Sequence, residues 1–381
     1  MSELVIERIE TTILDIPLIR PHKFSLLSID TQAVLLVRVH TCDGIIGVGE
    51  GVVPGGPWWG GESIEGMRAL IDGYIAPLLV GEDAFRVDYL LTRLDRMIHA
   101  ASFAKAGVEM ALWDAVGRAL DAPLHQLLGG AHRRSLPVTW ALGADPVGTV
   151  VEEAQEKLES GAHRSFKLKM GALPPAEDVA RVAAVAERLA GRAGLAVDLN
   201  ASWDEPTARR WLPALDDAGI SLIEQPLPAR AVDAAARLRS RQNARLMADE
   251  SLLDTADAQL LAASGAADVF ALKLAKSGGI GNVRRIAAIA EAAGIGCYGG
   301  TTIETSLGTA AAIHTFCALA PLTEGTELFG PLLLADDIAV NPVTYRDGEL
   351  ILAESGQRNG GIGIELDEDK VAKYARCDER V

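Results

Sequence analysis

The sequence has few cysteines and histidines for its 381 residues, and neither type is grouped. The four cysteines show no CxxC spacing, which argues against a zinc site or a redox pair. The seven histidines form no HxxxH pair or cluster, so we expect them to be structural, except for His22 in a loop near a site. The glycine-rich stretches at 278–281 and 360–363 do not follow a strand with the spacing of a dinucleotide-binding fingerprint.

Basic residues are also scarce. There are 36 Lys and Arg against 52 Asp and Glu, giving a net charge of −16, so we expect no nucleic-acid partner. No stretch approaches the roughly 20 apolar residues of a membrane helix, so no membrane partner is expected either. The opening MSELVIERIE has neither the basic start nor the apolar stretch of a signal peptide. These absences predict a cytoplasmic protein, in which an anionic substrate would need locally concentrated positive charge.

The apolar pattern divides the chain into three parts. Residues 1–130 begin with strand-like segments at 4–14, 31–40 and 45–50 and continue with helical periodicity at 63–79, 85–99 and 102–120, which predicts an α+β cap. Residues 131–330 alternate short apolar strands with alanine-rich amphipathic helices. Residues 331–381 have too few helical signals for another domain, and we expect them to pack back against the cap and complete it.

The middle part has the pattern of a barrel. We expect strands at 137–141, 165–170, 195–199, 221–224, 246–248, 269–273, 296–298 and 323–327. Between them we expect helices that include 176–190, 207–218, 231–240, 255–264 and 283–293. Repeated strand–helix units imply parallel strands with right-handed crossovers. Eight such strands favour a closed α/β fold of the (β/α)₈ or TIM-barrel type over an open doubly wound sheet.

Charged residues recur at the carboxyl ends of these strands, where the active sites of such barrels lie. Glu327 ends the last strand. Five others are spaced by 29, 26, 25 and 24 residues, about one strand–helix unit each: Lys169, Asp198, Glu224, Asp249 and Lys273. Since each step advances by one strand, we expect these side chains to form a ring.

The three acids of this ring have the chemistry of a metal site. Asp198, Glu224 and Asp249 come from adjacent strands and should point at a common centre. Three hard oxygen ligands fit Mg²⁺ or Mn²⁺ better than zinc. Without a cation, they would repel one another and raise each other's pKa. The alternative is that each acid caps a helix or forms a local ion pair, which explains one acid better than three in register.

The lysines add acid–base chemistry. Lys167 and Lys169 lie two apart on one strand, so both should point into the barrel, with Lys273 across from them. Neighbouring ammonium groups disfavour each other's charge, so we expect at least one lowered pKa. Lysines on either face of a metal-held carboxylate can make and protonate an enediolate. A Schiff-base lysine is the rival use, but it predicts one isolated lysine without the acids. Lys276, in the next loop, is expected to be solvated.

Seven motifs of the barrel part occur in order: FKLKMG, VDLNASWDE, LIEQP, MADES, ALKLAKSGG, CYGGTTIE and GTELFGPLLLADD. Together with IERIETTILDIPLIRPHK near the N-terminus, they resemble the muconate cycloisomerase (muconate-lactonising) branch of the enolase superfamily. The resemblance covers essentially the whole chain. It implies a modified enolase barrel under an α+β cap and a homo-oligomer, commonly an octamer.

The resemblance also implies roles for single residues. Asp198, Glu224 and Asp249 match the metal ligands. Lys169 matches the acid/base that delivers a proton, Lys167 the neighbour that supports charge, Lys273 the lysine of the opposite face, and Glu327 the acid of the last strand. Specificity is implied for cap loops around 19–24 and 52–59. Substrate-binding or supporting positions are implied for Asn200, Glu250, Pro54, Trp59 and His22.

The implied reaction is the metal-dependent lactonisation of a small dicarboxylate, cis,cis-muconate, to muconolactone. Residues 323–327 lack the Asp-x-Asp pair typical of dipeptide epimerases, which argues against an amino-acid substrate. Ala201 replaces a common glutamine, and the aromatic, proline-rich loop at 54–59 is similar to that of chloromuconate relatives. The alternatives are therefore a chloromuconate cycloisomerase, an o-succinylbenzoate synthase or racemase on the same scaffold, and a non-catalytic binding barrel.

Overall fold

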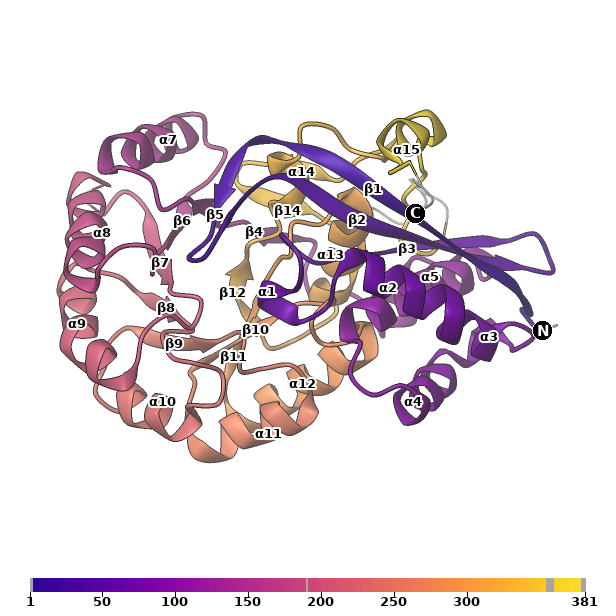
Figure 1. Ribbon diagram of the computed structural model, residues 1–381, viewed down its shortest axis with the longest axis horizontal. Coiled ribbons are helices and arrows are strands. Elements are labelled where there is room, and N and C mark those ends of the chain that lie inside the picture. The colour runs from indigo at the N-terminus through magenta and orange to yellow at the C-terminus, as the bar shows by residue number, and fades with distance from the viewer. Residues whose placement is uncertain (1–2, 190, 354–359, 378–381) are drawn as a thin grey trace.

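The computed structural model describes residues 3–189, 191–353 and 360–377, and its largest element is a curled sheet of eight parallel strands (Figure 1). A single parallel bridge joins Val138 to Thr326, and the amide of Thr139 donates to the carbonyl of Thr326 at 2.7 Å, so the two edges of the sheet meet. The predicted (β/α)₈-type barrel is confirmed. Its strands are β5 (Trp140–Leu142), β6 (Ser165–Lys169), β7 (Gly194–Asp198), β8 (Leu222–Glu224), β9 (Arg245–Ala248), β10 (Val269–Leu272), β11 (Gly296–Gly299) and β12 (Leu322–Thr326).

Helices cover the outside of this sheet, and Figure 1 shows α7 to α12 in an arc around the strands. The expected helices of this part are present, although Ala190, the expected end of one, lies outside the described residues. The sequence analysis did not name α7 or α13. The barrel helices are α7 (Val147–Glu159), α8 (Pro175–Leu189), α9 (Glu205–Asp217), α10 (Val232–Arg239), α11 (Thr255–Ser264), α12 (Ile280–Ala293) and α13 (Ser306–Cys317).

The cap is an antiparallel sheet, β1 (Ile6–Lys23), β2 (Ser28–Thr41) and β3 (Ile46–Val52), packed against helices. Residues 19–23, expected in a loop, belong to β1, because its pairing with β2 resumes after a register shift with His22 opposite Ile29. The hairpin reaches the barrel, where Lys23 pairs with Asp145. The helical elements are α1 (Pro57–Gly60), α2 (Ile64–Leu70), η1 (Ile71–Ile75), α3 (Ala76–Leu79), η2 (Ala84–Arg86), α4 (Val87–Met97), α5 (Ser102–Ala119) and α6 (Leu124–Leu127).

Helix α5 packs directly on β3, and alternate glycines make this close approach possible. A Cβ atom on Gly47 would lie 2.1 Å from the carbonyl oxygen of Ala111, and one on Gly49 would lie 2.3 Å from that of Gly107. Contacts this short are forbidden, so no other residue fits there without moving the helix. The alternation of glycine in β3 therefore sets the distance between the cap sheet and α5.

The C-terminal segment contacts both other parts of the chain. It comprises α14 (Gly330–Leu333), β13 (Thr344–Arg346), β14 (Glu349–Ile351) and α15 (Glu368–Tyr374), and β14 pairs with β4 (Ser135–Pro137) below the barrel. Strand β4 therefore belongs to a small sheet with β13 and β14 and not to the barrel, so the first barrel strand starts later than expected. Arg376 pairs with Asp15 of β1 at 2.6 Å. Within the described ranges, no helix has the length and apolarity needed to cross a bilayer.

Candidate active site

The strand ends bring the seven charged residues singled out from the sequence into one buried centre. All seven side chains belong to residues that are almost completely buried. Strand β6 carries both lysines at its end, as expected from their spacing of two, and the acids follow on the next three strands. The seven are Lys167, Lys169, Asp198, Glu224, Asp249, Lys273 and Glu327.

Each of the three predicted metal ligands binds at least one lysine. The distance from Lys169 Nζ to Asp198 Oδ2 is 2.5 Å, and that from Lys167 Nζ to Glu224 Oε2 is 2.6 Å. Lys167 also pairs with Glu327 of the last strand. On the other side of the barrel, Lys273 Nζ lies 2.6 Å from Asp249 Oδ2. Every acid of the centre is therefore paired with a lysine.

Burial and charge shift the pKa values in this centre in opposite directions. Burial alone lowers the pKa of Lys167, but the charges of Glu224 and Glu327 outweigh it and raise that pKa well above its ordinary value. This is the opposite of the lowered lysine pKa expected from the sequence, because two carboxylates pair directly with Lys167 and their charges outweigh burial. Burial and the charge of Asp198 raise the pKa of Glu224 well above its ordinary value. Of the three predicted metal ligands, Glu224 is thus the one whose negative charge is least compensated by its surroundings.

The donor set fits a divalent cation. No group of three or more His, Cys, Asp or Glu side chains stands preassembled among the described residues, because the lysines separate the acids. However, Glu224 Oε1 is buried and has no hydrogen-bond partner, which is costly unless something else binds it. The donors are carboxylate oxygens, which Mg²⁺ and Mn²⁺ prefer. Asp198, Glu224 and Asp249 are therefore the residues able to hold such an ion.

Lys276 was expected to be solvated, and this was wrong. Its side chain is 0% exposed, and its Nζ donates to Asp249 Oδ1 at 2.6 Å and to the backbone oxygen of Asp249 at 2.7 Å. Asp249 therefore binds one lysine with each carboxylate oxygen. Burial raises the pKa of Asp249, but Lys273 and Lys276 outweigh this and hold it well below its ordinary value.

A cavity above this centre collects most of the remaining predicted residues. His22, Pro54, Trp59 and Asn200 line it together with Lys169, Lys273 and Glu327, so cap and barrel both contribute. The sequence analysis missed the residues of the loop after β11 that also face this cavity, and those after β12 apart from Glu327. They are Thr301, Thr302, Ile303 and Phe329. Residues of these types are common in any sequence, so nothing marked them as site residues before the fold was known.

Glu250 lies behind the cavity and connects cap and barrel. Its Oε1 accepts hydrogen bonds from the indole of Trp59 at 3.2 Å and from the amide of Asn200 at 3.1 Å. The ring of Trp59 also lies 4.5 Å from Lys273 Nζ, within cation–π range. Burial, followed by the charges of Lys169 and Arg20, lowers the pKa of His22 well below its ordinary value, so it is neutral at pH 7.

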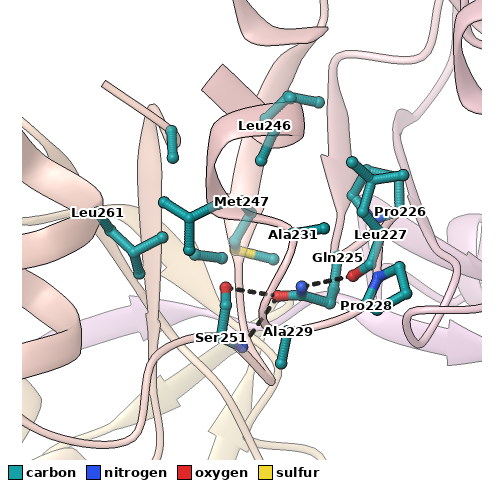
Figure 2. Close-up of a pocket in the computed structure, with 14 residues that line it drawn as sticks. Gln225, Pro226, Leu227, Pro228, Ala229, Ala231, Leu246, Met247, Ser251 and Leu261 are labelled. Carbon is teal, nitrogen blue, oxygen red and sulfur yellow. Dashed lines mark hydrogen bonds between the residues drawn. The ribbon is translucent and has the colours of Figure 1, made fainter. Parts of the chain in front are cut away.

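Gln225 is a supporting residue to which the sequence analysis gave no role. Figure 2 shows it at the edge of an apolar cavity, with its side-chain amide between Ser251 and Leu227. Its Oε1 accepts hydrogen bonds from the backbone amide of Asp249 at 2.9 Å and the hydroxyl of Ser251 at 2.9 Å, while its Nε2 donates to the carbonyl of Leu227 at 2.8 Å. Gln225 follows Glu224 directly, so it ties the ends of β8 and β9 together.

Two family models match the chain in sequence. Residues 8–129 match the N-terminal domain of the mandelate racemase/muconate lactonizing enzyme family, and residues 149–370 match the enolase C-terminal domain-like family. Muconate cycloisomerase 1 of Rhodococcus opacus is 49% identical over 99% of this chain and 100% of the relative. A chloromuconate cycloisomerase of Cupriavidus pinatubonensis is 43% identical over 96% of this chain and 97% of the relative.

Solved structures agree with these relatives. The muconate lactonizing enzyme of Pseudomonas fluorescens in complex with muconolactone has a TM-score of 0.96 at 44% identity, covering 98% of this chain and 100% of that chain. The 2-chloromuconate cycloisomerase of Rhodococcus opacus 1CP has a TM-score of 0.94 at 42% identity, covering 98% and 100%. The chain therefore belongs to the mandelate racemase/muconate lactonizing enzyme family of the enolase superfamily, whose enzymes depend on a divalent metal ion.

Proposed function

We propose that this chain is a muconate cycloisomerase, which converts cis,cis-muconate to muconolactone. The observation that carries the proposal is that Lys169 and Lys273 face one cavity from strands on different sides of the barrel, above three buried acids. Full-length identity of 49% to a muconate cycloisomerase supports the same substrate. Asp198, Glu224 and Asp249 would hold a divalent ion, which would supply positive charge for a substrate carboxylate, and their hard oxygens favour Mg²⁺ or Mn²⁺.

The lysines account for the chemistry. One carboxylate oxygen of muconate forms a bond to the nearer carbon of the distant double bond, which is β to the other carboxylate, and the electron pair of that double bond moves toward the other carboxylate as an enolate. Lys167 stabilises this developing negative charge, and Lys169 gives a proton to the enolate carbon. Lys273, on the other side of the cavity, adds positive charge to the opposite face. One proton is gained and no group leaves, so the product is an isomer of the protonated substrate.

The cavity walls favour a planar, partly apolar dicarboxylate. Pro54 and Trp59 from the cap and Phe329 from the barrel supply apolar surface beside the lysines. A chloromuconate cycloisomerase is the second candidate, because the same walls would accept a chlorine atom and relatives with that name are 38–43% identical. A cytoplasmic location stays a prediction from the sequence pattern, and a homo-octamer stays a prediction from the resemblance.

An ultraviolet assay tests the proposal. Purified enzyme with Mg²⁺ or Mn²⁺ should remove the diene absorbance of cis,cis-muconate and produce muconolactone, and EDTA should abolish the reaction until metal is added back. The same assay with 2-chloromuconate, followed by chloride analysis, separates the second candidate. Absence of turnover with muconate at saturating metal would contradict the proposal and move the substrate to another carboxylate.

Replacing Gln225 by leucine is expected to weaken Mn²⁺ binding roughly 10–100-fold, the usual cost of removing a contact that orients a metal ligand. The reason is that the Asp249 amide and the Ser251 hydroxyl lose their shared acceptor. Calorimetric titration with Mn²⁺ measures this affinity, and Gln259→Leu on the exposed face of α11 is the matched control. Unchanged Mn²⁺ affinity in a folded Gln225→Leu protein would show that Gln225 does not support the metal site.

A further inference from the structure

Two carboxylates of the cap are buried where the cap meets the barrel, and each reaches the start of a barrel helix. Glu50 in β3 and Glu109 in α5 are both 2% exposed. The Oε1 of Glu50 accepts from the amide of Thr305, the residue before α13, at 2.9 Å, and its Oε2 accepts from the Thr305 hydroxyl at 2.5 Å. The Oε1 of Glu109 accepts from the amide of Gly281, in the first turn of α12, at 2.9 Å.

The loop that Glu50 anchors is part of the cavity wall. Ile303 lines the cavity and has a positive φ of 64°, a conformation that a β-branched residue adopts only when its surroundings enforce it. Next to it, Glu304 accepts from the amide and hydroxyl of Thr302 at 2.8 and 2.6 Å. The strained loop is therefore held from within by Glu304 and at its far end by Glu50.

The same loop contacts the catalytic centre. The amide of Thr301 donates to Glu327 Oε1 at 3.4 Å, and Glu327 pairs with Lys167. The path from Glu50 to Lys167 thus consists of one short loop and three direct contacts. A shift of this loop would move the partner of Lys167.

Glu109 anchors the neighbouring loop in the same way. A Cβ atom on Gly279 would lie 1.5 Å from Glu109 Oε2, so only glycine at this position leaves room for the carboxyl. Gly279 has a φ of 118°, which also requires glycine. The stretch begins two residues after Lys276, which binds Asp249. The second cap carboxyl therefore fixes the segment that carries Lys273 and Lys276.

We propose that Glu50 and Glu109 are positioning residues, through which the cap sets the geometry of the two loops that carry or contact the catalytic lysines. Neither residue lines the cavity, so each acts through its loop. The kinetic test of this proposal rests on the proposed function, whereas the hydrogen-exchange test does not rest on it.

The protonation state of both groups suggests the conservative replacement. Burial raises the pKa of Glu50 to about 8 and that of Glu109 to about 7, in each case despite hydrogen bonds that lower it. At pH 6, below both pKa values, a neutral amide therefore resembles each buried carboxyl in size and charge, and its oxygen still accepts from the same backbone amide. Leucine has a similar volume but offers no acceptor.

The experiment compares Glu50→Leu and Glu109→Leu with Glu50→Gln, Glu109→Gln and the exposed control Glu187→Leu. We expect kcat of each leucine variant to fall about 100-fold with little change in KM, the size of effect that a displacement of about 1 Å produces. Each glutamine variant should recover most of this loss. Hydrogen exchange should show faster exchange at 300–305 in Glu50→Leu and at 277–281 in Glu109→Leu, well below the Tm.

Folded leucine variants with a lowered Tm but with wild-type kcat and loop exchange would overturn the proposal and leave two ordinary structural anchors. Glutamine variants as impaired as leucine would also overturn it. If Glu50→Leu does not fold, Thr305→Val, which removes the hydroxyl bonds to Glu50 and to the amide of Leu307 in the first turn of α13, should still lower kcat and increase exchange at 300–305. Wild-type inactivity on muconate would refute the proposed function alone, since the exchange measurement needs no substrate.

Discussion

Lys169→Ala is expected to lower kcat about 10³- to 10⁴-fold, the upper range for removal of a general acid, without unfolding the protein. Lys169 is one of the two lysines that face the cavity, and it is held by Asp198 at 2.5 Å, in a position to give a proton to bound substrate. Alanine cannot replace this proton. The other charges of the centre remain, so substrate should still bind.

The measurement is kcat and KM for muconate at saturating metal, so that the metal ion compensates Asp198. Lys373→Ala, an exposed lysine of α15 with a 61% exposed side chain, is the control and should behave as wild type. Circular dichroism verifies the fold. General acid–base catalysis contributes at least about 10²-fold to the rate. A kcat within about tenfold of wild type would therefore refute the role assigned to Lys169.

Asp249→Asn is expected to destabilise the protein by roughly 3–5 kcal/mol and nearly to abolish metal binding, since it removes one partner from a buried ion pair. Asp249 is 0% exposed and is the counter-charge of both Lys273 and Lys276. Lys276 has no access to solvent, so its charge cannot be hydrated instead. Because the lysines depress the Asp249 pKa, this stability is present above its ordinary value of 3.8 and is lost only in stronger acid.

Urea unfolding at pH 7 and calorimetric titration with Mn²⁺ test this prediction, with Asp217→Asn on the exposed end of α9 as control. The difference in unfolding free energy between wild type and Asp249→Asn should shrink as the pH falls below about 4, where the ordinary carboxyl is protonated. Wild-type affinity for Mn²⁺ in the folded variant would exclude Asp249 as a ligand.

The sequence predicted the barrel strands well because short apolar segments alternate with amphipathic helices, and six of the eight strand ends carry a charged residue. The strand expected at 165–170 is β6 (Ser165–Lys169), and that expected at 269–273 is β10 (Val269–Leu272). Helix α13 was not named, because all 12 of its residues are buried and it therefore has no polar face to reveal its period.

Residues whose role depends on distant partners were beyond the reach of sequence patterns. Glu50 and Thr305 are 255 positions apart, and Glu109 and Gly281 are 172 apart. Gln225 acts on backbone amides, which every sequence contains. Lys276 was misjudged because a lysine in a glycine-rich segment is usually solvated, and only the packing of that segment against Asp249 buries it. The ring of charged residues at the strand ends could be predicted, whereas the contacts that support it required the fold.

The glycine alternation of β3 limits how this protein can be recombined with its relatives. Gly47 and Gly49 fix the depth at which α5 lies, and α5 carries Glu109 to the barrel. In a chimera that takes its cap from another family member, α5 would pack on β3 at a different distance unless β3 and α5 are exchanged together. The crossover points of such a chimera therefore belong outside β3 and α5, and the receiving barrel has to keep Gly279 to accommodate the incoming acid.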